Sequence, residues 1–202
     1  MITATILVFN NANTIDRAIS SVLPYSNRVI VVDGAFKDYP HRFDYSTDGT
    51  AEIAQTYPQV EFVKGTEYAT EAQKRNVYLS MLKEGELFLV LGSEQELSEL
   101  DENAYKDPFS FLKILRPQQR IQWQLAPRLF RYKNDMFYHN HYLMEIGSQV
   151  YSLANQKDDR KICGVINNLD KPITGDYQEW KSIQTKNEIL VEKELRKTHR
   201  IY

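Results

Sequence analysis

The sequence predicts an α/β fold in which a mainly parallel central sheet is flanked by helices, with a smaller α+β part toward the C-terminus. Two observations support this prediction. Over about 90 N-terminal residues, short β-branched runs alternate four times with segments of helical spacing. Right-handed crossovers onto a parallel sheet are the simplest topology for that alternation. The second half changes to extended segments interrupted by aromatic residues, followed by a long charged helix.

The first strand and the first helix are predicted over residues 2–9 and 13–23. Residues 2–9 form an apolar, β-branched run that is too short for a helix. Between residues 13 and 23, apolar side chains recur with helical spacing, Asn13 or Thr14 can serve as N-cap, and Pro24 ends the run. A buried strand therefore leads directly into an amphipathic helix.

Two more strands and a helix follow. Residues 28–33 form a second β-branched run, which ends on the carboxylate of Asp33. Residues 46–50 (Ser-Thr-Asp-Gly-Thr) have side chains that satisfy the free N–H groups of a helix start. The helical pattern of residues 51–57 is therefore predicted to begin there with structural capping, and residues 60–63 are predicted to form the third strand.

A third helix and a fourth strand complete the predicted sheet. Three apolar side chains fall on one helical stripe within residues 70–82, and residues 87–91 form an apolar run. Ligands of open parallel sheets bind outside the carboxyl ends of the strands. The predicted ends carry Asn10, Asp33, residues 65–68 and residues 92–94. We expect these four ends to converge on one crevice.

The second half is predicted to form an α+β cap on the first. Extended segments are expected over residues 121–131, 137–144, 149–153 and 162–166, and a charged amphipathic helix is expected over residues 177–198. No linker rich in Gly, Pro and Ser separates the halves. A single domain is therefore expected.

Composition and charge argue against several classes of protein. The formal net charge is −2, with 25 basic and 27 acidic residues interspersed, so nucleic acid is not an expected partner. No apolar run of about 18 residues occurs, and the N-terminus lacks a signal-peptide pattern, so we expect a cytoplasmic protein. The single cysteine, Cys163, has no nearby His or second Cys, which argues against disulfide and metal-cluster roles. Mixed charges along residues 181–200 favour a solvated helix face, with transient membrane contact as the alternative.

Three side chains are candidates for nucleotide recognition from their positions alone. Asp33, at a strand end before a glycine, could accept a hydrogen bond from the edge of a base, or could simply form a turn. Lys74 and Arg75 lie early on a helix in the run 72–76, which places a cation and an amide where they could reach a base or a phosphate across the crevice. The alternative for this pair is a solvated helix face.

Five segments stand in an order that resembles the family 2 glycosyltransferases of the GT-A fold. They are residues 6–11 (Ile-Leu-Val-Phe-Asn-Asn), 31–34 (Val-Val-Asp-Gly), 46–50, 72–76 (Ala-Gln-Lys-Arg-Asn) and 89–97 (Leu-Val-Leu-Gly-Ser-Glu-Gln-Glu-Leu). The corresponding family stretches are a strand ending in Asn, VDGxSTDGT, xARN and LDADExL. The resemblance spans about residues 2–98, and it is extended weakly by residues 127–131 (Pro-Arg-Leu-Phe-Arg) and by the closing helix.

This resemblance implies a Rossmann-like GT-A fold. It implies transfer of a sugar from a nucleoside-diphosphate sugar to an acceptor hydroxyl, with inversion at the anomeric carbon. Residues 1–98 would hold the nucleotide-sugar, and residues 99–202 would form the acceptor-side half and closing helix. The acceptor is expected to be a glycan, a lipid-linked molecule or a protein. The implied nucleotide-binding residues are Phe9, Asn10, Asp33, Lys74 and Arg75.

Two departures from the family pattern affect the donor side. Where the family has Asp-x-Asp, which supports the diphosphate through a divalent cation, this chain has residues 92–94 (Gly-Ser-Glu). Glu94 and Glu96 remain as candidate oxygen ligands for Mg²⁺ or Mn²⁺, and an exposed turn is the alternative. Residues 36–45 form an insertion of ten residues, which either covers the donor or is a surface excursion.

The catalytic base expected for an inverting transfer must lie within hydrogen-bond reach of the acceptor hydroxyl. The candidates are Asp135, His139, His141 and Glu145, of which we favour Glu145 first and His141 second. Along one extended segment, His139, His141 and Glu145 would share a face. A pair of His at this spacing is also common on ordinary surfaces. Near the closing strand, where the family has a later His, this chain has residues 167–168 (Asn-Asn).

The sequence leaves two alternatives to a transferase. A nucleotide-sugar-binding or scaffolding protein that keeps the fold without catalysis is favoured by the altered Asp-x-Asp. A dinucleotide-binding oxidoreductase is disfavoured, because Gly-x-Gly-x-x-Gly is absent after the first strand.

Overall fold

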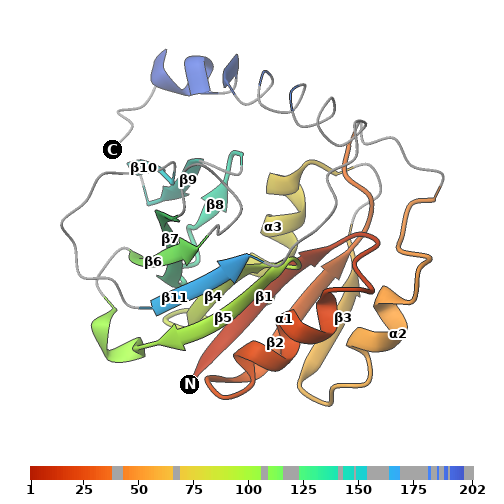
Figure 1. Ribbon diagram of the computed structural model, residues 1–202. Coiled ribbons are helices and arrows are strands. Elements are labelled where there is room, and N and C mark those ends of the chain that lie inside the picture. The colour runs from red at the N-terminus through yellow and green to blue at the C-terminus, as the bar shows by residue number, and fades with distance from the viewer. Residues whose placement is uncertain are drawn as a thin grey trace.

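The computed structural model contains a large sheet, helices on both of its faces and a small second sheet (Figure 1). It describes residues 1–37, 43–65, 69–105, 109–115, 123–140, 143–147, 149–153, 164–168, 182, 186, 189–190 and 192–197. The elements are β1 (Ile2–Val8), α1 (Ile15–Val22), β2 (Ser26–Asp33), α2 (Thr50–Ala54), β3 (Val60–Lys64), α3 (Glu71–Leu79), β4 (Leu87–Gly92), β5 (Gln95–Leu100), the 3-10 helix η1 (Glu102–Ala104), β6 (Phe109–Leu115), β7 (Trp123–Arg131), β8 (Phe137–Tyr138), β9 (Leu143–Ile146), β10 (Gln149–Ser152) and β11 (Gly164–Asn168).

The large sheet changes from parallel to mixed at β7. Its eight strands stand in the order β3-β2-β1-β4-β7-β6-β11-β5. Strands β3, β2, β1 and β4 are parallel neighbours, whereas β7 runs antiparallel to both β4 and β6. Strand β11 is parallel to β6, and β5 is antiparallel to β11. The predicted α/β class and the mostly parallel sheet are confirmed.

The sheet curls so that its last strand returns to the first helix. Strands β4 and β5 follow each other in the chain but are not neighbours in the sheet, and β5 packs on α1. Leu97 of β5 shares a core with Ile15 and Ile19 of α1. On the surface beside this contact, Arg17 forms an ion pair with Glu96 at 2.8 Å. The turn after β4 is thereby tied to α1.

Each face of the large sheet has its own hydrophobic core. In β2, Val29 and Val31 join the core that contains α1, whereas Ile30 and Val32 join the core that contains α3. All four side chains are fully buried, and full burial of such a side chain contributes about 1.5–3 kcal/mol. Because both faces are covered, a central parallel strand is apolar at every position rather than at alternate ones. This is why its sequence is a continuous β-branched run.

Helices α1 and α3 form near their predicted positions. In α1, the four apolar side chains on the sheet side are fully buried. Thr14 is the N-cap residue, as one of the two predicted alternatives, although its side chain makes no capping hydrogen bond. Helix α3 begins after Thr70, which forms a capping box with Gln73. It ends at Leu79, three residues before the predicted end.

Two strands were not expected from the sequence, and one predicted strand is wrong. Strands β5 and β6 occupy a stretch for which no element was predicted. Residues 137–144, predicted as one extended segment, contain a bend, so that β8 and β9 form an antiparallel pair. His139 N–H donates to the carbonyl of Leu143 at 3.0 Å across this bend. Side chains of the two strands therefore meet across a hairpin rather than along one face.

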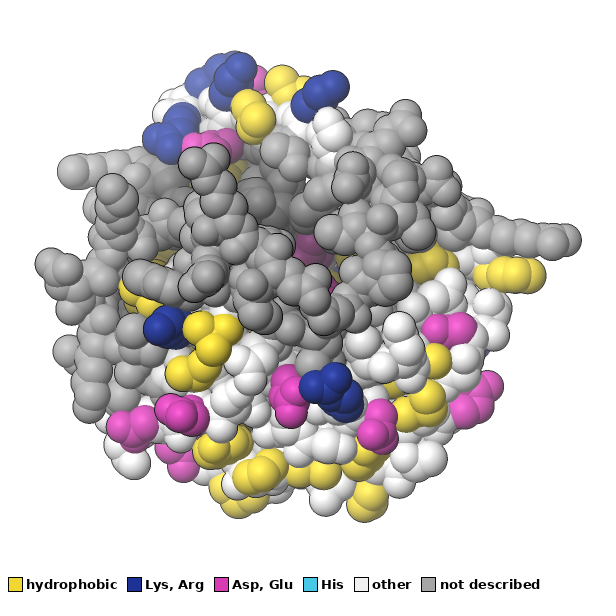
Figure 2. Space-filling view, viewed as in Figure 1, with side chains coloured by type: hydrophobic (Ala, Val, Ile, Leu, Met, Phe, Trp, Pro, Cys, Tyr) yellow, Lys and Arg dark blue, Asp and Glu magenta, His cyan; other side chains and the backbone are white. Residues whose placement is uncertain are grey.

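The surface and the remaining helical residues add two observations. Of the predicted helix over residues 177–198, those that the structure describes are helical, and the others lie outside the described residues, as does Cys163. None of the helices within the described residues combines the length and the apolar character needed to cross a membrane. Figure 2 shows acidic and basic side chains interspersed on one face of the molecule.

Candidate functional site

The carboxyl ends of β1 and β2 are joined through Ser46. Asp33, the last residue of β2, is 1% exposed, and its carboxylate accepts from the Ser46 hydroxyl at 2.6 Å and from the Ser46 N–H at 3.1 Å. The Ser46 hydroxyl also accepts from the N–H of Asn10 at 2.8 Å. Asn10 in turn accepts from the N–H of Thr47 at 3.0 Å. Three of the resemblance segments therefore meet at one edge of the sheet.

Asn10 is exposed and has a left-handed backbone with φ of 52°, a conformation that Asn adopts more readily than most residues. Phe9, next to it, is 8% exposed, and its N–H donates to the side chain of Asn11 at 2.8 Å. Asn11 N–H donates to the Thr50 hydroxyl at 2.7 Å. The turn after β1 is thus fixed by side chains of residues 46–50.

The role predicted for residues 46–50 as a helix cap is confirmed in part, because Asp48 rather than the N-cap residue accepts from a free N–H group at the helix start. The N-cap of α2 is Gly49, with φ of 96° and no side-chain capping bond. Instead, Asp48 accepts from the N–H of Ala12 at 2.9 Å and from the N–H of Thr50 at 3.1 Å. The segment therefore acts mainly as a bridge from the turn after β1 to the start of α2.

Lys74 and Asp33 form a buried pair of opposite charges. Lys74 is fully buried, donates to the carbonyl of Gly34, and places its Nζ 4.1 Å from the ring centroid of Phe36. Burial lowers the pKa of Lys74 to about 8, although the charge of Asp33 opposes this shift. Burial raises the pKa of Asp33, against its hydrogen bonds from Ser46 and the charge of Lys74. The ammonium group of Lys74 therefore offsets the negative charge of Asp33 at the carboxyl end of β2.

Arg75 points in a different direction from Lys74, because successive helical residues are about 100° apart around the axis. Its guanidinium contacts Glu71 at 2.6 Å and the Tyr78 hydroxyl at 3.2 Å. It also lies 5.2 Å from the ring centroid of Tyr138 in β8. The structure therefore places the two predicted cations on different sides of α3 rather than together.

The two predicted metal ligands follow β4 but have different partners. Glu94 accepts from the Ser93 hydroxyl at 2.9 Å, whereas Glu96 is held by Arg17 of α1. Between them, Gln95 accepts from the N–H of Gly92 at 2.8 Å. Across the described ranges, no group of three or more His, Cys, Asp or Glu side chains is arranged to hold a metal ion. These residues do not fit the divalent-cation site that the resemblance implies.

The favoured base, Glu145, is paired with an imidazole across the β8–β9 hairpin. His139 Nε2 lies 2.7 Å from Glu145 Oε2, and both side chains are partly exposed. His141, the second choice, lies outside the described residues. Asp135 is exposed, and Asn167 donates to the hydroxyl of Ser98.

The hairpin is attached to α3 by one side chain. Asn76 donates from its amide nitrogen to the carbonyl of Tyr138 at 3.0 Å and accepts from the N–H of Tyr138 at 2.8 Å. This two-way bond fixes β8, and with it the His139–Glu145 pair, against the helix that also carries Lys74. The sequence predicted that an amide of residues 72–76 could reach a base or a phosphate, whereas the amide of Asn76 holds the backbone of β8. Its polar side chain between apolar stripe residues was the available signal.

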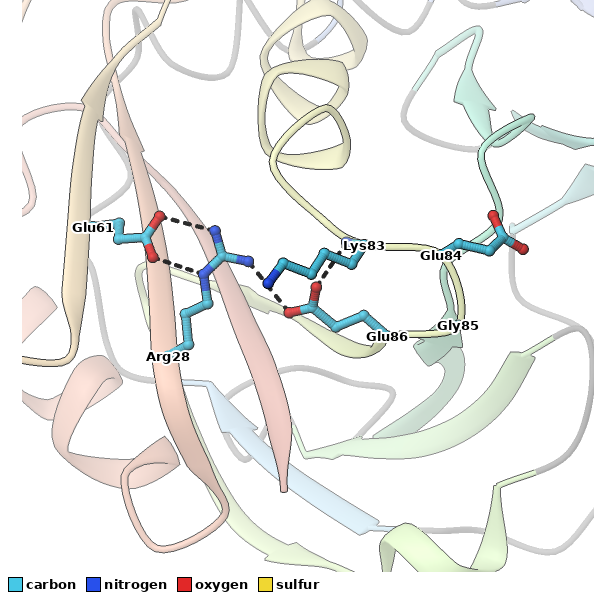
Figure 3. Close-up of a pocket in the computed structure, with 6 residues that line it drawn as sticks. All are labelled: Arg28, Glu61, Lys83, Glu84, Gly85 and Glu86. Carbon is cyan, nitrogen blue, oxygen red and sulfur yellow. Dashed lines mark hydrogen bonds and ion pairs between the residues drawn. The ribbon is translucent and has the colours of Figure 1, made fainter.

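An open cavity of about 590 Å³ lies at the opposite edge of the sheet. Figure 3 shows Arg28 between Glu61 and Glu86 there, close to the turn before β4. Arg28 contacts Glu61 at 2.7 and 2.9 Å and Glu86 at 3.3 Å. The cavity is thus at the amino ends of the parallel strands, and these charges already satisfy one another. We do not assign the functional site to it.

Comparisons with known proteins gave structural similarities only. No family model matches the sequence, and no curated protein matches it significantly. The chain is similar to a crystal structure of S. aureus TarS 1-349 in complex with UDP, at 22% identity over 57% of this chain and 35% of that chain, with a TM-score of 0.42. It is similar to S. aureus TarS at 16% identity over 93% of this chain and 39% of that chain, with a TM-score of 0.46. It is also similar to GalNAc-T7 with UDP, GalNAc and Mn²⁺, at 15% identity over 57% of this chain and 24% of that chain, with a TM-score of 0.42. This chain therefore spans well under half of each of these three chains.

Proposed function

We propose that the protein transfers a sugar from a nucleoside-diphosphate sugar to an acceptor hydroxyl, with inversion. The observation that carries this proposal is the hydrogen-bonded junction of Asn10, Asp33 and Ser46 at the carboxyl ends of two parallel strands. That edge is where open α/β sheets bind ligands. The junction also joins three of the five segments on which the resemblance to family 2 glycosyltransferases rests.

In this proposal the base of the nucleotide lies against the turn after β1. Asn10 is exposed there, next to Phe9, which is 8% exposed. A carboxylate has about four acceptor sites, so Asp33 retains capacity for a donor N–H of the base beyond its bonds to Ser46. Burial raises the pKa of this carboxylate, and the hydrogen bonds from Ser46 and the charge of Lys74 oppose that shift and favour its charged form.

Glu145 is proposed as the general base of the transfer. The acceptor oxygen attacks the anomeric carbon, the bond from that carbon to the diphosphate oxygen breaks, and the nucleoside diphosphate leaves with the electron pair. The acceptor proton passes to Glu145, which His139 holds in position through the 2.7 Å contact. Because the described residues do not assemble a metal site, we derive no step through a metal ion.

The proposal is tested by incubating the protein with a panel of nucleotide-sugars and hydroxyl acceptors, and measuring release of nucleoside diphosphate and formation of product. Glu145→Gln is expected to lower kcat by about 10²–10⁴-fold, the usual contribution of general base catalysis, with little change in KM for the donor. Glu99→Gln, which removes an exposed carboxylate on β5, is the control. Absence of transfer and donor hydrolysis with every donor, with and without Mn²⁺, would contradict the proposal.

A second candidate function is nucleotide-sugar binding without catalysis. It is favoured by the partners of the acidic side chains after β4, where Glu96 is held by Arg17 and Glu94 is bound to Ser93. Tight binding of a nucleoside diphosphate without turnover, unaffected by Glu94→Ala, would support this alternative over the transferase.

A further inference from the structure

Arg128 of β7 is a partly buried cation whose Nε lacks an acceptor. Its Nε is fully buried and has no hydrogen-bond partner. Among the described residues, no carboxylate lies within ion-pair distance of its guanidinium. Three of the groups that act on its charge, Arg75, Glu71 and Tyr78, belong to α3. The side chain therefore enters the layer between the sheet and α3.

The neighbours of Arg128 increase the positive charge there. Arg75, on α3, carries a second guanidinium, and Glu71 supplies the compensating carboxylate. Burial and the charge of Arg75 together lower the pKa of Arg128 to about 10, while the charge of Glu71 opposes the shift. Two cations thus share one carboxylate among the described residues.

Tyr138 adds another buried donor without an acceptor. Its hydroxyl is buried near Tyr78 and Arg75 but makes no hydrogen bond of good geometry, and its ring lies beside the guanidinium of Arg75. Buried polar groups without partners are rare in native proteins, and each calls for an explanation such as a missing ligand. Two donor groups without acceptors therefore lie beside an excess of positive charge. This combination is typical of a site for an anion.

The position of Arg128 in the sheet indicates which anion. Leu129 pairs with Leu89 in the antiparallel register of β7 and β4. Because the two strands are antiparallel, Arg128 lies one residue closer than Leu129 to the end of β4 that leads to Gly92 and Glu94. This is the strand end at which the family's carboxylate pair would support the diphosphate. In this chain Gly92 stands at the position of the first carboxylate of that pair.

We propose that Arg128, with Arg75 and Tyr138 beside it, binds the diphosphate of the nucleotide-sugar directly. The inference rests on the proposed function and specifies how its donor site neutralises the leaving group. A guanidinium presents a planar set of donors that matches two phosphate oxygens at once. Directly bound phosphate would supply the acceptors that Arg128 and Tyr138 lack.

The first experiment measures binding by isothermal titration calorimetry in the presence of a chelator. The probes are inorganic pyrophosphate, UDP, orthophosphate and uridine. Arg128→Met is expected to weaken pyrophosphate and UDP by about 10–100-fold, the range for hydrogen bonds to charged groups, and to leave uridine unchanged. Orthophosphate is expected to bind the native protein more weakly than pyrophosphate. Arg131→Met, which removes an exposed arginine of the same strand, is the control and should bind like the native protein.

The second experiment separates binding from structure by thermal denaturation. Removal of a cation whose buried Nε has no acceptor should leave Tm unchanged or raised without ligand, and should abolish the rise in Tm that pyrophosphate produces. A Tm well below that of the native protein would identify Arg128 as a structural residue and overturn the proposal. Equal pyrophosphate affinity in Arg128→Met and native protein would also overturn it.

These results are distinguishable from failure of the proposed function. Arg128-dependent pyrophosphate binding without sugar transfer by any donor would retain the anion site and reject the transferase. Sugar transfer that is unaffected by Arg128→Met would retain the transferase and reject the anion site.

Discussion

Replacement of Lys74 by Met is expected to change how stability depends on pH. Burial lowers the pKa of this amine from 10.5 to about 8 in the folded protein. Between these two pKa values the unfolded chain binds more protons than the folded protein, so the free energy of unfolding rises as pH rises. At 1.36 kcal/mol per pKa unit, the whole shift corresponds to about 3 kcal/mol, of which about 2 kcal/mol is expected between pH 7 and 9.5.

Urea denaturation of both proteins at several pH values between 7 and 9.5 measures this effect. The difference between the native protein and Lys74→Met removes the contributions of other titrating groups, because both proteins share them. We expect the native protein to gain about 2 kcal/mol relative to the variant across this range. Lys83→Met, which removes an exposed lysine, is the control and should give a curve parallel to the native one.

A difference between Lys74→Met and native protein that does not vary with pH would refute this reasoning. It would mean that the amine titrates alike in the folded and unfolded states. In that case Lys74 would be solvated rather than enclosed between Gly34 and Phe36, and the buried charge pair with Asp33 would not exist.

Three further predictions concern hydrogen bonds described above. Ser46→Ala should lower the free energy of unfolding by about 1.5–3 kcal/mol, the range for hydrogen bonds to charged groups. The reason is that the buried carboxylate of Asp33 loses its donor at 2.6 Å. Urea denaturation at pH 7 measures this loss, and an unchanged midpoint would contradict the prediction. Asn76→Ala should lower stability by about 1–3 kcal/mol and speed amide hydrogen exchange at Tyr138, whereas unchanged exchange would show that the hairpin is held by other contacts. Burial works to raise the pKa of Glu86, but hydrogen bonds and Arg28 outweigh it, so the folded pKa is lowered. Its stabilisation is therefore present above the unfolded pKa of about 4.3 and is lost as pH falls through the lower folded value. Glu86→Gln should be less stable than native protein at pH 7 and equally stable in strong acid, and a constant difference would argue against it.

The first four strands could be predicted because each is buried on both faces. A continuous apolar run such as Val29 to Val32 has few other solutions at that length. Strand β5 was missed because its buried side chains, Gln95 and Leu97, alternate with polar ones in a stretch that was assigned to a motif. The bend between β8 and β9 was not predicted, since residues 137–146 contain no Gly or Pro to mark a turn.

The convergence of Asn10 and Asp33 followed from topology alone, because parallel strands end at one edge of the sheet. Which neighbouring cation faces that edge depends on the rotation of α3 about its axis, and the sequence does not fix this rotation. Lys74 therefore lies close enough to Asp33 for their charges to interact, whereas Arg75 faces β8. The role of Arg128 could not be predicted in this way, because the register of β7 against β6 shifts beside it and interrupts the alternation of faces.

The double hydrogen bond of Asn76 has a consequence for association between molecules. Strand β8 is the edge of the three-stranded sheet β10-β9-β8, and the outward N–H and carbonyl of an edge strand are a template for pairing with another chain. At Tyr138 the side-chain amide of Asn76 forms hydrogen bonds with both groups, as a neighbouring strand would. The small sheet is thus blocked at this edge by one side chain, and loss of that amide would expose a site for intermolecular strand addition.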